Sequence, residues 1–292
     1  MRRPGGEETA RHRSCVAPRV SRVSTDLVDL PPRFGMDRPA FDRLGSGPPG
    51  EPRLATSVIL VRDGAEGLEV FVLERTTAMA FAGGMTVFPG GGLDATDREA
   101  LAEGLVDEAT AADAARSWGT APADAAALLA CAVRETFEET GVLLAATRPL
   151  AGARERLTSR EIALRDVAAR IEAERLRPWA RWIAPETAPR SYDTAFFVAA
   201  VPAGQEPDGA TSEAVAAAWC SPRRALREWE DGRRALMPPT WAVLTELSGA
   251  GDTATLLAAA AQRRPEPVTP SFRPQGDRVR LAVPPHALGA AR

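Results

Sequence analysis

The stretch VRETFEETG, residues 133–141, places three glutamates and one arginine within nine positions. An α-helix advances about 100° per residue, so Glu138 and Glu139 lie within about 60° of Glu135, and all three carboxylates share one face. Like charges at this spacing repel each other, and the negative end of the helix dipole adds to the repulsion. Arg134 can pair with Glu138 but cannot neutralise the set. The pattern therefore predicts a bound Mg²⁺ or Mn²⁺ ion, with a solvated helix surface as the alternative.

The flanking sequence predicts that these glutamates lie on one long helix, TAPADAAALLACAVRETFEETG at 120–141. Thr120 is suited to cap its N-terminus, and Pro122 is favourable in the first turn. Gly141 suits the left-handed conformation that commonly follows a helix. Apolar residues at four-residue intervals form a second face that we expect to pack in the core, namely Leu129, Val133 and Phe137.

A glycine turn precedes this helix in MTVFPGGGLD, residues 85–94. Because glycine has no side chain, its backbone groups can approach a phosphate or a metal ion closely. The alternative is a tight connection between a strand and a loop. Together, a glycine turn and a helix rich in carboxylates suit a phosphate bridged by a metal ion.

Composition excludes several other functional classes. The chain has 292 residues, a net charge of −3, three cysteines and two histidines. This charge gives no general attraction to nucleic acid or membrane. So few histidines and cysteines argue against a zinc site, a Ser-His-Asp triad or a disulfide framework, and the odd number of cysteines fits a reducing cytoplasm. No apolar run reaches membrane-spanning length, so we expect a cytoplasmic protein without a membrane partner.

The chain divides into three predicted parts. Residues 1–50 are rich in Arg, Pro and Gly and predict a mostly disordered arm, which contacts a polyanion in the alternative interpretation. Residues 51–248 predict the main domain, and 249–292 a C-terminal helix and a tail that pack on it. Strands and helices are mixed, which predicts a layered α/β or α+β domain. Strands are predicted at 54–61 and 68–75, which together form a hairpin, and at 142–146, 177–185, 192–202, 214–220 and 278–283. Further helices are predicted at 97–117, 158–175, 223–232, 239–249 and 253–264.

The segments FPGGGLDATD (88–97) and RETFEETGV (134–142) together resemble the Nudix box, G-x5-E-x7-R-E-U-x-E-E-x-G-U, in which U is a bulky aliphatic residue. Gly91 takes the opening glycine, and Asp97 stands where the first glutamate belongs. The second half matches at Arg134, Glu135, Glu138, Glu139, Gly141 and Val142, with Thr136 at a U position. Residues 98–133 intervene where the family usually has seven, and the helix-sized insertion itself is placed at 98–119.

One Nudix subgroup carries an insertion at this point, the coenzyme A diphosphatases of peroxisomal and mitochondrial type, and this chain is similar to it over roughly residues 54–245. The resemblance implies a Nudix-type α/β/α sandwich around a mixed β-sheet, with extra helices. Nudix enzymes that act on coenzyme A have two arginines before the glycine turn. Arg75 matches the first, and Ala80 stands at the second position.

The resemblance also implies a metal-dependent pyrophosphohydrolase. Glu135, Glu138 and Glu139 would hold Mg²⁺ or Mn²⁺, with the carbonyl of Gly90 as a further ligand. Arg134 would orient the carboxylates. Either Glu135 or Glu213 would be the general base, because relatives differ in this residue. Substrate contacts are expected at Arg75, Phe81, Gly90 and Gly91.

The expected partner is a small nucleoside diphosphate derivative, with coenzyme A or acyl-coenzyme A as the first candidate. ADP-ribose and dinucleotides are alternatives, as is a module that senses a nucleotide without cleaving it. The presence of all three box glutamates favours catalysis over nucleotide sensing. We expect no nucleic-acid partner, and the sequence leaves a homodimer open.

Overall fold

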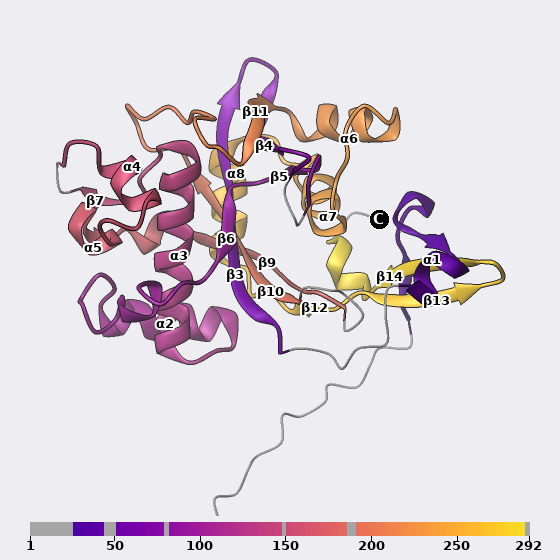
Figure 1. Ribbon diagram of the computed structural model, residues 1–292, viewed down its shortest axis with the longest axis horizontal. Helices are drawn as coiled ribbons and strands as arrows, with labels where there is room; N and C mark the ends of the chain where they lie inside the picture. The colour runs from indigo at the N-terminus through magenta and orange to yellow at the C-terminus, as the bar shows by residue number, and fades with distance from the viewer. Residues whose placement is uncertain (1–25, 44–50, 79–81, 148–149, 186–190, 290–292) are drawn as a thin grey trace, which may run out of the picture.

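A mixed eight-stranded sheet forms the centre of the computed structural model, which describes residues 26–43, 51–78, 82–147, 150–185 and 191–289 (Figure 1). Its path runs β11-β4-β3-β10-β9-β12, with β5 paired to β4 and β6 paired to β3. The strands are β3 (Arg53–Gly64), β4 (Gly67–Arg75), β5 (Thr86–Val87), β6 (Gly90–Gly92), β9 (Arg177–Ile183), β10 (Tyr192–Ala200), β11 (Ala214–Cys220) and β12 (Pro267–Val268).

Strand β3 is buried on both faces because it lies in the middle of the sheet. It pairs antiparallel with β4, which confirms the predicted hairpin, and parallel with β10. Side chains alternate along a strand, so Val58 and Leu60 enter the core on one face, whereas Ile59 and Val61 enter the core on the other. The run of apolar residues in LATSVILV therefore reflects two cores, one on each side of the sheet.

Helices cover both faces of this sheet (Figure 1). On one side lie α2 (Glu108–Trp118) and α3 (Pro122–Thr140), and on the other α6 (Pro222–Glu230), α7 (Pro238–Leu247) and α8 (Thr253–Ala261). This arrangement confirms the predicted α/β/α sandwich with a mixed sheet and extra helices. Among the described residues, none of the helices combines the length and the apolar character that a membrane crossing requires.

Helix α3 has most of the predicted features. Leu129 and Val133 are buried in the core, and Gly141 adopts a left-handed conformation with φ of 75°. The N-cap is Ala121 rather than the predicted Thr120, and Pro122 occupies the first turn. The predicted helix at 97–117 is only partly correct. A short 3-10 helix, η2 (Asp97–Glu99), is followed by turns before α2 begins after its N-cap Asp107.

The prediction of disorder for the arm was wrong for the part that the structure describes. A second sheet joins the N-terminal segment to a C-terminal hairpin (Figure 1). Leu30, whose N–H donates to the carbonyl of Leu281, is buried. Residues 1–25 and 44–50 lie outside the described residues. The elements are β1 (Val28–Asp29), η1 (Pro32–Phe34), β2 (Met36–Asp37), α1 (Arg38–Arg43), β13 (Ser271–Gln275) and β14 (Arg278–Val283), followed by η4 (Pro285–Leu288).

The predicted helix at 158–175 was also wrong. Instead, a short strand in this segment pairs with β7 and buries Ala168 and Ile171, which local periodicity could not reveal. The predicted strand at 142–146 begins only at Ala145. The elements here are β7 (Ala145–Thr147), α4 (Ala153–Thr158), α5 (Leu164–Val167), β8 (Ala168–Ile171) and η3 (Ala173–Arg175).

Candidate functional site

The glycine turn lies directly against the acidic end of α3. The backbone N–H of Gly90 donates a hydrogen bond to Oε2 of Glu139 at 2.8 Å. A Cβ on Gly90 would lie 2.2 Å from the carbonyl oxygen of Thr56, and a Cβ on Gly91 would lie 2.5 Å from Oε1 of Glu135. Position 90 therefore requires glycine, because the clash is with backbone, whereas a side chain at position 91 would displace the carboxylate of Glu135.

The three glutamates lie in a poorly solvated position. Burial, with the charge of Glu135 as a further cause, raises the pKa of Glu139 to about 8. Burial also raises the pKa of Glu138 to about 7 and raises that of Glu135. Among the described residues, no arginine forms an ion pair with Glu139. Crowded buried carboxylates of this kind are stabilised by a cation.

Arg134 is the main cation beside this cluster, and its side chain is 1% exposed. It donates to both carboxylate oxygens of Asp97 at 2.9 and 2.7 Å, and to the carbonyl of Gly92 at 3.1 Å. It also reaches Oε1 of Glu135 at 2.8 Å and Oε2 of Glu138 at 3.3 Å. Burial opposes the charge of Arg134, but the hydrogen bonds to Asp97 and the nearby carboxylates raise its pKa. Asp97 thus connects the start of the insertion to α3.

A second arginine, Arg160, reaches the same cluster from the segment after α4. Its Nη1 lies 2.9 Å from Oε1 of Glu138 and 3.2 Å from Oδ2 of Asp94. Sequence reasoning missed both Arg160 and Asp94. Neither belongs to a recognisable motif position, and Arg160 is brought in by the turn that replaces the predicted helix.

The donor set fits a hard dication, because carboxylate oxygens are the ligands that Mg²⁺ and Mn²⁺ prefer. Among the described residues, however, no three Asp, Glu, His or Cys side chains already converge on one position for an ion. Oxygens of Glu135 and Glu138 instead accept hydrogen bonds from Arg134 and Arg160. Binding an ion therefore requires that these side chains rearrange.

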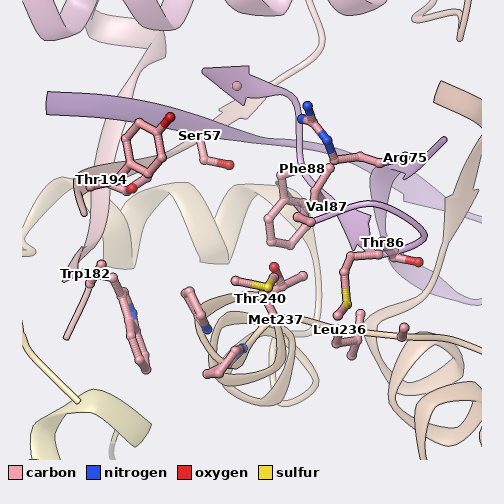
Figure 2. Close-up of a pocket in the computed structure, with 18 of the residues that line it drawn as sticks. Ser57, Arg75, Thr86, Val87, Phe88, Trp182, Thr194, Leu236, Met237 and Thr240 are labelled. Atoms are coloured by element: carbon pink, nitrogen blue, oxygen red, sulfur yellow. The ribbon is translucent and has the colours of Figure 1, made fainter. Parts of the chain in front are cut away.

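A pocket of about 1330 Å³ begins beside the glycine turn (Figure 2). Glu135 lines it, together with Arg75 and Glu213. Nη2 of Arg75 lies 2.8 Å from Oε2 of Glu213, so the structure brings these two predicted residues together. Glu138 and Glu139 lie outside the pocket lining. The predicted contact residue Phe81 lies outside the described residues.

The far part of the pocket is apolar. Trp182 and Met237 line it, and Figure 2 shows both side chains on the side of the pocket away from Arg75. The second sheet contributes the apolar side chains of Met36 and Phe272, and η1 contributes that of Phe34. Sequence reasoning missed this wall because its residues come from distant parts of the chain, both ends included.

A cluster of charges closes one edge of the same pocket. Arg234 lines the pocket and donates to the hydroxyl of Thr86 at 3.1 Å. Glu228 accepts hydrogen bonds from Arg224 at 2.8 Å and from Arg234, and these bonds lower the pKa of Glu228 to about 2. The charges of this cluster are paired with each other, and Arg234 connects Glu228 of α6 to Thr86 of β5, so we assign the cluster a structural role.

Known proteins resemble this chain in sequence and in fold. Residues 105–247 match the model of the NUDT19 Nudix domain. A putative nudix hydrolase 7 from Caenorhabditis elegans is 30% identical over 208 residues, which cover 68% of this chain and 62% of that protein. An acyl-coenzyme A diphosphatase NUDT19 from Homo sapiens is 29% identical over 224 residues, covering 60% of this chain and 59% of that protein. The chain thus spans about three fifths of these relatives.

Among solved structures, a NUDIX hydrolase from Alicyclobacillus acidocaldarius is 28% identical, with a TM-score of 0.56, over 71% of this chain and 96% of that one. The segment matched by the family model contains the whole second half of the box that the sequence predicted. Motif, family model and fold agree, and in all three the chain is similar to Nudix proteins.

Proposed function

We propose that this protein is a divalent-metal-dependent pyrophosphohydrolase that cleaves a diphosphate linkage in a nucleoside diphosphate derivative. The observation that carries the proposal is the contact between Gly90 and Glu139, which holds a glycine turn against the glutamates of α3, beside a large pocket that Glu135 lines. A diphosphate that enters this pocket from the side of Arg75 would come close to Glu135.

Mg²⁺ or Mn²⁺ would be held by Glu135, Glu138 and Glu139, with the carbonyl of Gly90 as a further ligand. When bound, such an ion neutralises diphosphate oxygens and lowers the pKa of a coordinated water. Arg134 would orient the carboxylates of Glu135 and Glu138, because it donates a hydrogen bond to each and is itself held by Asp97.

Arg75 and Glu213 line the pocket and would contact the substrate directly. Glu213 is the candidate general base beside Glu135, since it lies on the pocket wall and is not buried among the box residues. Arg75 suits a substrate phosphate because its Nε is buried and lacks a hydrogen-bond partner among the described residues. Phe81, Gly90 and Gly91 remain proposed contact residues.

The substrate that we favour is an acyl-coenzyme A or coenzyme A. Relatives from Xenopus laevis and Homo sapiens are named acyl-coenzyme A diphosphatases. The apolar part of the pocket would accept an apolar arm beyond the diphosphate, and the groups that line it include Trp182 and Phe272. ADP-ribose and dinucleotides lack such an arm. Hydrolysis of these two in preference to acyl-coenzyme A would favour the alternative substrates.

A substrate panel with product identification by mass spectrometry tests the proposal. The panel contains coenzyme A, acyl-coenzyme A of increasing chain length, ADP-ribose and dinucleotides, each with Mg²⁺ or Mn²⁺. Glu138→Gln and Glu139→Gln are expected to lower turnover about 100-fold or more, because each removes a ligand charge. Glu66→Gln, an exposed turn residue, is the control. Unchanged turnover in both box variants would reject the metal assignment, and tight nucleotide binding without hydrolysis would indicate a sensing module.

A further inference from the structure

Arg160 adopts a backbone conformation that arginine rarely takes. Its φ is 62°, and within the described residues it shares a positive φ, among residues other than glycine, only with Ala82. The residue directly follows the C-cap Ser159 of α4, and its N–H donates to the carbonyl of Leu157 at 3.0 Å. Glycine is preferred at such a position because a side chain there is strained. Helix termination alone therefore does not explain the arginine.

The contacts of the Arg160 guanidinium explain why an arginine occupies this strained position. It reaches Oε1 of Glu138, whose other oxygen accepts from Arg134, so that both oxygens of this proposed metal ligand are bonded to arginines. The same guanidinium also contacts Asp94. The two arginines differ in burial, because the side chain of Arg134 is 1% exposed and that of Arg160 is 55% exposed.

This difference decides which arginine can give way to an ion. Arg134 cannot withdraw, because the buried carboxylate of Asp97 would then lose its ion-pair partner. Arg160 can turn into water at less cost, because its side chain is already 55% exposed and the incoming ion replaces its charge beside Glu138. A guanidinium that stayed beside Glu138 would repel a dication bound to the same carboxylate.

We infer that Arg160 is a positioning residue that holds Glu138 and Asp94 while no dication is bound, and that withdraws when one binds, so that it sets the metal affinity of the site. The inference rests on the proposed function only in taking Glu138 as a metal ligand. It assigns a role to a residue outside the Nudix box, at a turn that carries backbone strain.

The test is calorimetric titration of Mn²⁺ alone into the full chain after removal of metal with a chelator. Arg160→Gly is expected to bind Mn²⁺ about tenfold more tightly than the parent, because a competing cation is removed. Arg160→Lys keeps a cation and is expected to stay near the parent. Arg156→Ala is the matched control, since Arg156 lies in the same segment and pairs with Glu161.

The folding of the variants is checked by thermal unfolding without metal. Arg160→Gly is expected to unfold within a few degrees of the parent, because the relieved strain offsets the lost ion pair. Equal or weaker Mn²⁺ binding by Arg160→Gly would overturn the inference, and so would an equal gain in Arg156→Ala, which would indicate a general charge effect. Glu138→Gln separates the two proposals. If it binds Mn²⁺ as well as the parent, the metal assignment itself fails.

Discussion

The buried pair of Asp97 and Arg134 should contribute strongly to stability, and Asp97→Asn measures this. Both side chains are 1% exposed, and two hydrogen bonds join them at 2.9 and 2.7 Å. The side-chain amide of asparagine has an oxygen that accepts hydrogen bonds and an NH2 group that donates them. In Asp97→Asn, the NH2 group would therefore face an N–H of the Arg134 guanidinium, and one of the two hydrogen bonds would be lost. Arg134 would then lose a charged partner without gaining access to water.

Breaking a buried ion pair by removing one partner costs about 3–5 kcal/mol. Arg134 keeps Glu135 and Glu138 as partners, so we expect a value near the lower end, about 3 kcal/mol. A matched control joins the same two elements on the surface. Arg98 and Asp124 lie 3.4 Å apart with side chains 56% and 40% exposed, and Asp124→Asn should cost about 1 kcal/mol or less.

The assay is urea denaturation of the chelator-treated protein, followed by circular dichroism at pH 7. Asp97→Asn is expected to lower the urea midpoint by about 1 M, and Asp124→Asn by much less. If the two variants shift the midpoint equally, then the insertion is not anchored to α3 through a buried charge. Asp97 would then not hold Arg134 in the position from which it orients Glu135 and Glu138.

Three further perturbations separate fold from chemistry. Gly90→Ala should lower the free energy of unfolding by about 2 kcal/mol or more, because its Cβ would meet a backbone oxygen at 2.2 Å; an unfolding midpoint equal to that of the parent would contradict this. Gly91→Ala should fold normally yet lose turnover, because its Cβ would displace only the movable carboxylate of Glu135; normal kcat would refute the contact. Glu228→Gln should be less stable than the parent at pH 7. The pKa of Glu228 falls from 4.5 to about 2 on folding, so the difference should be complete above pH 4.5 and disappear as the pH falls through about 2. Denaturation at pH 7 and at acidic pH checks this, and a difference that does not depend on pH would contradict it.

Local signals in the sequence were reliable wherever a segment depends mainly on its own neighbours. The hairpin of β3 and β4 and the long helix α3 were predicted because periodicity and glycine positions mark them within a short window. The glycine turn and the three glutamates were recognised for the same reason, since the box is a contiguous chemical pattern apart from its insertion.

Predictions failed where a distant partner decides the structure. The strand β8 forms within a predicted helix because β7 pairs with it and buries Ala168 and Ile171. The N-terminal arm becomes ordered in part because β1 and β2 pair with β14, near the other end of the chain. No local pattern contains that information, because a short strand gains its hydrogen bonds only from its partner.

The site divides in the same way. The sequence alone determined which side chains carry charge on one face of α3, because helix periodicity is a local property. It also determined where the backbone of the glycine turn can approach another group closely, because glycine has no side chain. Tertiary structure alone decided that Asp97 anchors Arg134, that Arg160 reaches Glu138, and that residues from distant parts of the chain form the apolar wall of the pocket. Such contacts depend on how separate elements pack against each other, and the free energy that selects among packings comes from burial and ion pairing between residues far apart in sequence.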